Sequence, residues 1–284
     1  MIYKREAAKI IAIINEKNPD TIIFNAENIL CLPYVKKRFP NVNYISWLHN
    51  NANTYLNRVF KGIKEDFIEG LKHSNCVVSL TKEDNKVFQS FNKNTIAISN
   101  PLTIDNHQIS TLDLKIISWT GRLVHPMKGI DYLAEIASRL PEGWKISVAG
   151  TGNEKVFDKF IKKYSADNKL IRQGALLGES LNVHYLNSSI YLMTSRWEGF
   201  PLVLAEAMSF GLPVIAFKQS GSTEVLEGGR DGILIENGDI EQIVNALLEL
   251  IVNKEKRIEY QKKSLERVKD FNLNSIVAQW ENII

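Results

Sequence analysis

Short apolar runs alternate along this chain with segments in which apolar residues recur at helical spacing. The runs that are long enough for β-strands form two groups. The first group is 21–24, 44–48, 76–80 and 95–98, and the second is 115–119, 145–148, 170–173, 190–194 and 213–217. Most of these runs are continuously apolar, which is typical of parallel strands covered on both faces. The alternation of strands and helices predicts doubly wound α/β architecture.

A polar stretch without clear periodicity separates the two groups of strands and begins with Asn100-Pro101. We interpret it as a linker between two Rossmann-like domains. The predicted limits are 1–100 for the N-terminal domain, 101–113 for the linker, 114–270 for the C-terminal domain and 271–284 for a closing helix. That helix should pack back toward the N-terminal domain, with Trp280 as its anchor. The N-terminal domain is incomplete, because it has room for about four strands where six or so are usual.

The first residues predict a helix and not the strand that normally opens a Rossmann unit. Ala8, Ile11 and Ile14 have helical spacing, so we expect an amphipathic helix packed on a sheet. The segment lacks the apolar core and cleavage site of a secretory signal. No window of about eighteen consecutive apolar residues is present, which argues against a membrane span.

Composition excludes some classes of function. Of 284 residues, 44% are apolar and 24% are charged, as in ordinary globular proteins. The net charge of +3 arises from 35 basic and 32 acidic residues, so no nucleic-acid partner is expected. Cys31 and Cys76 have no metal-ligand spacing, which predicts free thiols, a reducing compartment and no metal site. We expect a cytoplasmic protein.

A short basic run raises the question of contact with a membrane. Lys36, Lys37 and Arg38 lie between Tyr34 and Phe39, a composition that would suit anionic lipid. A solvated helix end is the commoner origin of so short a run. Peripheral contact with the inner face of the plasma membrane remains an open alternative.

The segment SRWEGFPLVLAEAMSFGLPVIAF, residues 195–217, carries the clearest chemistry. An apolar strand ends at Ser195 and a loop follows. Pro201 is expected at the first position of a helix, where its fixed φ and missing N–H cost nothing. Gly211 should end this helix, and Pro213 should open the next strand.

A helix that starts at the carboxyl edge of a parallel sheet can bind an anion. The backbone N–H groups of Phe200, Leu202 and Val203 should point out of that edge, where they suit a diphosphate. Glu198 lies in the loop before the helix, and Glu206 in its second turn. Two carboxylates beside an anion site make sense if each accepts hydrogen bonds from vicinal sugar hydroxyls. The alternative is a helix-start acid plus a surface glutamate.

Two further motifs follow strands of the second group. WTGRLVHPMKG, residues 119–129, places Arg122 and Lys128 at the carboxyl end of one strand, although surface cations beside a turn are the alternative. VAGTGNE, residues 148–154, places Gly150 and Gly152 in a turn after the next strand. The third glycine and the ribose-binding acid of a dinucleotide fingerprint are missing. Direct contact with a ligand and a purely structural turn are both open for these two glycines.

Glu-x7-Glu within EGFPLVLAEAMSFGLPVIAF resembles the signature of retaining GT-B glycosyltransferases of the GT4 type. The resemblance implies that Glu198 contacts the donor sugar and that Glu206 holds the nucleotide ribose. Gly199, Phe200, Pro201, Leu202 and Val203 would complete that part of the donor site. It also implies retention of anomeric configuration.

Other segments resemble the same family. Arg122 and Lys128 match its GR-x(n)-KG element and would reach the donor diphosphate, where fixed cations stabilise the departing group. Residues 148–152 match a turn that lines the nucleotide pocket, and Ala175 and Leu176 match residues that hold the base through backbone groups. Residues 220–224 match a GG-x-x-E segment that closes over the donor, except that Ser220 replaces the first glycine.

In the N-terminal half the resemblance is weaker. His49 follows a strand and matches a histidine near the donor sugar or acceptor, so the resemblance implies a part in catalysis for it. A lone histidine with only a structural role is the alternative. VVSLTKED matches a strand and cap, in which Thr81 should cap a helix together with Asp84. The family's opening strand and glycine-rich loop have no counterpart.

The resulting hypothesis is a hexosyltransferase that uses a nucleotide-diphosphate sugar, most simply a UDP-sugar, and a glycan or lipid-linked acceptor. It would act in cell-surface polysaccharide synthesis without a cofactor or a metal ion. A non-catalytic sugar-nucleotide-binding protein and a sugar-nucleotide epimerase remain open. The incomplete glycine fingerprint argues against an NAD-dependent oxidoreductase.

Overall fold

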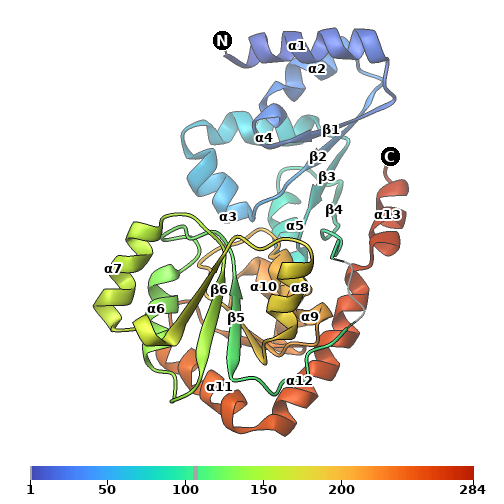
Figure 1. Ribbon diagram of the computed structural model, residues 1–284. Coiled ribbons are helices and arrows are strands. Elements are labelled where there is room, and N and C mark those ends of the chain that lie inside the picture. Colours follow the sequence, from blue (N-terminus) through green and yellow to red (C-terminus); the bar gives the residue numbers. More distant parts are fainter. Residues whose placement is uncertain (1, 105–107) are drawn as a thin grey trace. The chain divides into compact units, whose positions relative to one another are not determined.

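The computed structural model describes residues 2–104 and 108–284, so residues 105–107 of the predicted linker lie outside the described part of the chain. The chain divides into two compact units (Figure 1). The first runs to Asn100 and takes in Asn274–Ile284, and the second spans Pro101–Leu273. Each unit is built on its own parallel sheet, so the predicted α/β class is confirmed.

The first unit holds a four-stranded parallel sheet in the order β1-β2-β3-β4. Its strands are β1 (Thr21–Asn25), β2 (Asn43–Trp47), β3 (Cys76–Ser79) and β4 (Thr95–Ala97). Its helices are α1 (Ile2–Lys17), α2 (Leu32–Arg38), the short α3 (Ala52–Thr54), α4 (Lys64–His73), α5 (Lys82–Phe88) and α13 (Leu273–Glu281). Every strand end lies within one residue of its predicted position.

The two faces of this sheet carry different cores, because successive strand residues point to opposite faces. Tyr44 and Val77 belong to the larger core, which α1, α2 and α4 help to form. Their neighbours Ile45 and Val78 belong to a smaller core, which is closed by residues of α13. The predicted packing of the last helix on this sheet is therefore what is observed within the first unit.

Two local predictions in this unit can be compared with the structure. Helix α1 forms as expected, but its fully buried positions are Ala7 and Ile14, while Ala8 is exposed. Of the predicted stripe, Ile14 is buried and Ile11 packs against the core, whereas Ala7 takes the buried position that was expected for Ala8. Thr81 caps α5 as predicted, because its hydroxyl oxygen accepts the Asp84 amide at 3.0 Å and its O–H donates to the Asp84 carboxylate at 2.6 Å.

The second unit holds a six-stranded sheet in the order β10-β9-β8-β5-β6-β7, with all pairs parallel. Its strands are β5 (Ile116–Thr120), β6 (Lys145–Ala149), β7 (Leu170–Gly174), β8 (Ile190–Met193), β9 (Val214–Phe217) and β10 (Ile233–Ile235). Its helices are α6 (Ile130–Ser138), α7 (Glu154–Tyr164), α8 (Glu179–Leu186), α9 (Leu202–Ser209), α10 (Ser220–Val225), α11 (Ile240–Val252) and α12 (Lys254–Arg267). This is the doubly wound order of a complete Rossmann unit.

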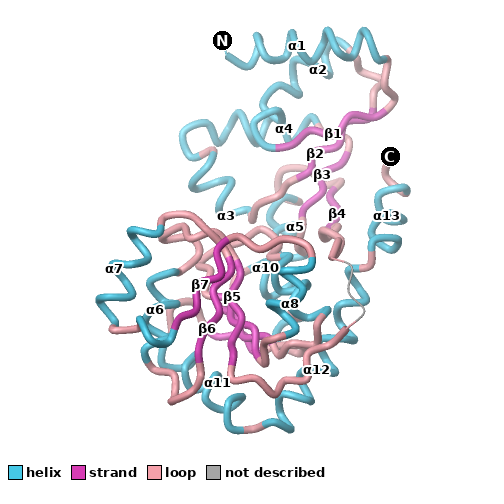
Figure 2. Tube along the Cα trace, in the orientation of Figure 1, coloured by secondary structure: helices cyan, strands magenta, loops and turns pink. Residues whose placement is uncertain are grey.

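Strand order reverses in this sheet between β5 and β8. The chain moves outward from β5 through β6 to β7, returns to β8 beside β5, and moves outward again through β9 to β10. Figure 2 shows these strands in magenta, with the loops that follow them in pink. In open parallel sheets, ligands bind outside the carboxyl ends of the strands where the order reverses. The loops after β5 and β8 therefore mark the candidate site.

Candidate functional site

Lys128 and Glu198 join the two loops that meet where the strand order reverses. Lys128 belongs to the loop after β5 and Glu198 to the loop after β8. The Lys128 Nζ lies 2.6 Å from the Glu198 Oε1, and the two side chains are only 13% and 14% exposed. The structure thus brings together a cation and a carboxylate that the sequence placed 70 residues apart.

Arg196 holds these two loops in position. Its guanidinium donates to both carboxylate oxygens of Asp131, at 2.8 and 2.6 Å, and to the Pro126 carbonyl at 2.7 Å. It also stacks 3.7 Å from the centre of the Tyr132 ring. Burial alone would raise the pKa of Asp131, but the hydrogen bonds and charge of Arg196 outweigh it and hold that pKa below its usual value. Arg196 therefore ties the β8 loop to the start of α6.

A second link runs through Thr194 at the end of β8. Its hydroxyl donates to the Lys128 carbonyl at 2.8 Å and accepts the Trp119 indole N–H at 2.9 Å. Gly129 has φ +61°, and a Cβ there would lie 2.0 Å from the Thr194 carbonyl oxygen. The backbone beside Lys128 is thus fixed by close packing, which limits where its ammonium group can reach.

Arg122 lines a cavity of about 260 Å³ at the carboxyl ends of β5, β6 and β7. Of the residues predicted for the site, Gly150, Ala175 and Leu176 line the same cavity. The Arg122 side chain is exposed, so it is accessible to a ligand. Arg122, Gly150, Ala175 and Leu176, which the sequence assigned to one site, thus line one cavity.

The two glycines after β6 have structural reasons to be glycine. A Cβ on Gly150 would lie 1.8 Å from the Gly121 carbonyl oxygen, and one on Gly152 would lie 2.8 Å from the Leu123 carbonyl oxygen. Both residues also have positive φ, +147° and +154°. Gly152 does not line the cavity, so the structural explanation suffices for it, whereas Gly150 both packs closely and lines the cavity.

Helix α9 starts one residue later than expected. Pro201, with φ −77° and ψ 89°, is the N-cap residue and not the first helical residue, because its ψ is not yet helical. The Leu204 amide bonds to the Pro201 carbonyl at 3.0 Å. In the described part of the chain, no residue accepts a hydrogen bond from the amides of Leu202 or Val203, both of which are partly exposed. These amides are available to an anion.

The rest of that loop is packed. Phe200 is buried, with its ring edge-on to Phe271 at 5.5 Å. A Cβ on Gly221 would lie 2.8 Å from the Gly199 carbonyl oxygen. Gln219 Oε1 accepts hydrogen bonds from the amides of Glu198 and Gly221, at 3.2 and 3.1 Å. The side chain of Gln219 thereby links the Glu198 loop to the start of α10.

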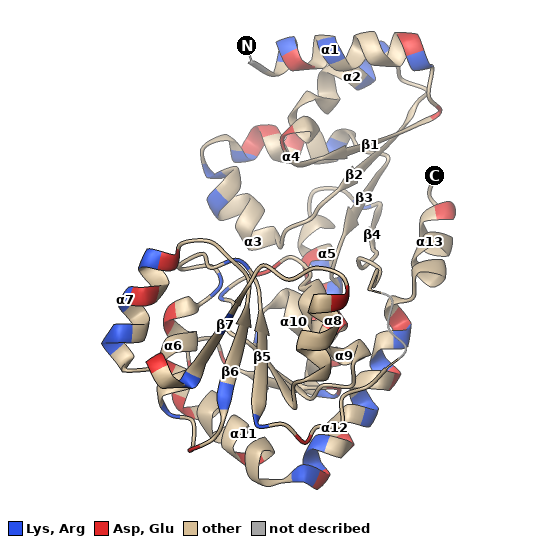
Figure 3. Cartoon of the chain, in the orientation of Figure 1, with Lys and Arg blue, Asp and Glu red and all other residues tan. Residues whose placement is uncertain are grey.

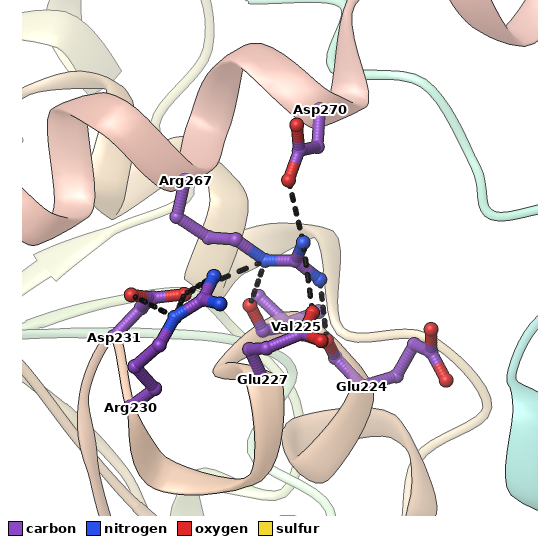
Figure 4. Close-up of polar contacts among 7 residues, drawn as sticks. All are labelled: Glu224, Val225, Glu227, Arg230, Asp231, Arg267 and Asp270. Atoms are coloured by element: carbon purple, nitrogen blue, oxygen red, sulfur yellow. Dashed lines mark hydrogen bonds and ion pairs between the residues drawn. The ribbon is translucent and has the colours of Figure 1, made fainter.

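The far end of α10 is held by Arg267 of α12 (Figure 4). Its guanidinium donates to the carbonyls of Val225 and Glu224, at 2.9 and 2.7 Å. It also pairs with the carboxylates of Asp270 at 2.6 Å and Glu227 at 3.0 Å. The segment predicted to close over a ligand is therefore fixed at both ends.

Glu206 sits in the second turn of α9 and is largely buried. Tyr185 of α8 donates a hydrogen bond to its Oε2 at 2.8 Å. Burial raises the pKa of Glu206 above the usual carboxyl value, and the hydrogen bond from Tyr185 opposes that rise. A glutamate on the surface would be neither buried nor hydrogen-bonded to a buried tyrosine. The surface-glutamate alternative therefore does not describe Glu206.

His49 belongs to the first unit, where it follows β2. Its ring lies 4.3 Å from the Trp47 ring, and its amide donates to the Tyr55 hydroxyl at 3.1 Å. Burial lowers the pKa of His49, so the imidazole is neutral at pH 7. Its predicted part in catalysis stays a prediction.

Sequence reasoning missed Arg196, Asp131, Tyr185 and Gln219. Arg196 lies inside the motif at residues 195–217, but nothing in the spacing of that motif identifies Asp131, 65 residues away, as its partner. Tyr185 and Gln219 precede and follow that motif, and their roles depend on which helices and loops pack together. No group of three or more metal-ligating side chains occurs among the described residues. Within that same part of the chain, no helix is long and apolar enough to cross a membrane.

Comparison with known proteins adds to this picture. The sequence profile of a family described as "Glycosyl transferases group 1" matches residues 104–267. An uncharacterized glycosyltransferase of Haemophilus influenzae is 30% identical over 290 residues, which covers 97% of this chain and 79% of that protein. The poly(ribitol-phosphate) alpha-N-acetylglucosaminyltransferase of Staphylococcus aureus is 30% identical over 233 residues, which covers 79% of this chain and 46% of that protein. The chain thus matches just under half the length of the staphylococcal relative.

Solved structures share the fold. HepE of Anabaena in complex with UDP superposes with a TM-score of 0.85 at 18% identity, covering 97% of this chain and 80% of that one. A variant of S. aureus TarM in complex with fondaparinux, α-GlcNAc-glycerol and UDP gives a TM-score of 0.81 at 24% identity, covering 98% of this chain and 58% of that one. At these identities the likeness concerns the fold.

Proposed function

The chain belongs to the glycosyl transferases group 1 family and has a GT-B fold, and we propose that it moves a hexosyl unit from a UDP-sugar to a glycan or glycolipid acceptor with retention of configuration. The observation that carries this proposal is the Lys128–Glu198 pair, 2.6 Å apart at the point where the strand order of the second unit reverses. That is where a doubly wound sheet binds a nucleotide.

The donor diphosphate would lie against the cations and free amides of the second unit. Lys128 Nζ, Arg122 and the amides of Leu202 and Val203 supply the positive ends. Glu198 then accepts hydroxyls of the donor sugar, and Glu206 accepts those of the ribose. Support for uridine comes from the HepE and TarM structures, which contain UDP.

The chemistry follows from these charges. The bond between the anomeric carbon and the diphosphate oxygen breaks, and a bond from the acceptor hydroxyl oxygen forms on the same face. The leaving diphosphate oxygen takes the proton of the acceptor hydroxyl. Negative charge develops on the diphosphate as the bond breaks, and Lys128 and Arg122 stabilise it there. These cations fill the role that a divalent ion plays in other transferases, so the proposed reaction needs neither a metal ion nor a cofactor.

A cell-surface polysaccharide or its lipid-linked precursor is the proposed acceptor. The S. aureus relative is named for transfer to poly(ribitol-phosphate), which is consistent with an acceptor of this class. A cytoplasmic enzyme would meet a lipid-linked acceptor at the inner face of the plasma membrane. Lys36 contributes little to such contact, because its Nζ donates to the His73 carbonyl and to Asn75 at 2.9 and 3.0 Å.

Figure 3 shows Lys and Arg interspersed with Asp and Glu along α7 and α12, which gives no support to a nucleic-acid partner.

Calorimetric titration with UDP, UDP-sugars and other nucleotides tests this proposal, followed by turnover assays against glycan acceptors. UDP should bind, and Glu206→Ala should weaken UDP binding by about tenfold or more. Glu198→Ala should lower kcat by about a hundredfold and change UDP affinity less. Glu241→Ala, at an exposed glutamate, is the matched control and should behave as wild type. Conversion of a UDP-sugar without any acceptor would overturn the proposal in favour of an epimerase.

A further inference from the structure

Tyr185 is a buried residue whose only polar group reaches into the proposed donor site. Its side chain is fully buried, and its hydroxyl lies 2.8 Å from the Glu206 Oε2. Tyr185 comes from α8 and Glu206 from α9, so the contact joins two helices that precede and follow β8. A hydroxyl beside a carboxylate donates its hydrogen, and the bond is strong because its acceptor is charged.

The position of this hydroxyl is fixed by aromatic packing. The Tyr185 ring stacks on Phe210 with centroids 5.2 Å apart and an interplanar angle of 27°. His184 meets it edge-on at 5.6 Å, and Tyr191 lies 6.0 Å away. A ring enclosed on these sides has one orientation, so its hydroxyl in turn fixes the orientation of the Glu206 carboxylate.

One carboxylate oxygen remains available. No described residue donates a hydrogen bond to the Glu206 Oε1, whereas Oε2 receives that of Tyr185. An ionised carboxylate has about four lone-pair sites, so one bond from Tyr185 leaves room for two hydroxyl donors. The carboxylate therefore keeps enough acceptor capacity for both hydroxyls of a vicinal diol.

We propose that Tyr185 is a positioning residue for nucleotide recognition, whose hydroxyl orients the Glu206 carboxylate toward the ribose hydroxyls of the donor. This inference rests on the proposed function, because Glu206 is there the ribose contact. It assigns to α8 a part in donor binding that neither the motifs nor the family match identifies.

Tyr185→Phe tests it, because this change removes the hydroxyl and keeps the ring. We expect UDP affinity to fall about tenfold, because a carboxylate that is no longer held in one orientation makes weaker hydrogen bonds to the ribose. The circular dichroism spectrum and thermal unfolding of the variant should show that it is folded. Retention of wild-type affinity would overturn the proposal.

The pH profile of UDP binding separates positioning from packing. Glu206 accepts both ribose hydroxyls only when it is ionised, so affinity falls as pH drops through its pKa. The Tyr185 hydroxyl opposes the rise in that pKa that burial causes, so its removal raises the pKa further. The acid limb of the binding profile should therefore move to higher pH in Tyr185→Phe. Ionisation of UDP itself is common to both proteins and cancels in the comparison. A loss of affinity without this movement would assign Tyr185 a packing role only and overturn the proposal.

Two further variants make the result specific. Tyr191→Phe removes a neighbouring buried hydroxyl, which donates to the Thr120 carbonyl at 3.4 Å and not to Glu206, so the acid limb should stay in place. In a Glu206→Gln background position 206 carries no titratable group, so adding Tyr185→Phe should not move the acid limb of the binding profile. If wild type binds no UDP, the proposed function fails. If wild type binds UDP but the acid limb of the Tyr185→Phe binding profile does not move, this inference alone fails.

Discussion

Arg196 joins the loops that carry Lys128 and Glu198 through one rigid guanidinium group. It donates to both oxygens of the Asp131 carboxylate and lies over the Tyr132 ring at 3.7 Å. Bidentate pairing and stacking each define an angle as well as a distance. The separation between the Lys128 and Glu198 side chains therefore depends on a third residue, Arg196.

We expect Arg196→Lys to damage activity more than stability. Lysine keeps the charge but ends in a single nitrogen, so it cannot bond both Asp131 oxygens and stack on Tyr132 at once. The expected loss is about tenfold to a hundredfold in kcat/KM, because small misplacements of reacting groups are costly. The free energy of unfolding should fall by about 1–2 kcal/mol. Steady-state kinetics and urea unfolding measure the two effects.

Arg139→Lys is the matched control for this change. Arg139 follows the C-terminal end of α6, the helix that begins next to Asp131, and its side chain is 39% exposed. It pairs with Glu135 and Glu241. Exposed pairs contribute little, so its unfolding free energy should change by less than about 0.5 kcal/mol and its kinetics not at all. A wild-type kcat/KM in Arg196→Lys would show that the positions of the Lys128 and Glu198 loops do not depend on the Arg196 guanidinium.

The candidate-site residues that the sequence could propose are those whose chemistry follows from their local motif. Glu198 and Glu206 stand out because two acids surround a helix start, and Lys128 because it follows a strand. Tyr185 and Arg196 could not be found in this way, because their partners are chosen by the packing of helices and loops. Spacing within a motif indicates which atoms can meet a ligand, but not which atoms orient them.

At the level of elements, α12 anchors the segment between α10 and β10 through Arg267 (Figure 4). The Arg267 side chain is 8% exposed, and it donates to the carbonyls at the end of α10. A cation is favourable there, because the last carbonyls of a helix lack partners. Helix α10 begins where Gly221 packs against the Glu198 loop. Because α12 holds the other end of α10, it stabilises the position of that loop indirectly.

Arg267→Met should therefore destabilise the second unit strongly. Methionine fills much of the volume but leaves the carbonyls of Glu224 and Val225 without this donor and the carboxylates of Glu227 and Asp270 without their ion-pair partner. The expected loss of unfolding free energy is about 3 kcal/mol, typical of breaking a buried charged contact. Arg230→Met is a close comparison, since Arg230 pairs with Asp231 at 2.9 Å but is 65% exposed. Chemical unfolding should separate the two variants clearly, and equal stability would contradict the anchoring role.

At the level of the whole molecule, the chain leaves the first unit after Asn100 and re-enters it at Asn274. The sequence predicted strands β1 to β9, because continuous apolar runs are typical of parallel strands covered on both faces, whereas β10 lies outside the two predicted groups. It also predicted the helix α13, in which Trp280 packs beside the smaller core of the first unit. It could not reveal the strand order of the second sheet or the partner of Trp280, since both depend on contacts between distant segments.

Helix α13 completes the first unit by covering one face of its sheet. Ile45, Val78 and Ile98 form a small core there with Ile276, and Trp280 packs beside them. The Trp280 ring meets the Trp47 ring edge-on at 4.8 Å. An apolar sheet face of this kind is unstable in water unless another element covers it. The last eleven residues of the chain, Asn274–Ile284, thus stabilise strands encoded near its beginning.

Trp280→Ala should for this reason act on the first unit and spare the second. Removing the indole exposes apolar side chains of β2 and β3, with an expected cost of about 2–3 kcal/mol for a partly buried tryptophan. Amide hydrogen exchange should become faster in β2, β3 and β4, while β5, β6 and β8 keep wild-type protection and UDP binding persists. Val277→Ala, at an exposed position of the same helix, should leave exchange unchanged. Faster exchange spread equally over both sheets would instead mean that the two cores unfold as one, and that α13 is not a local cover for the first unit.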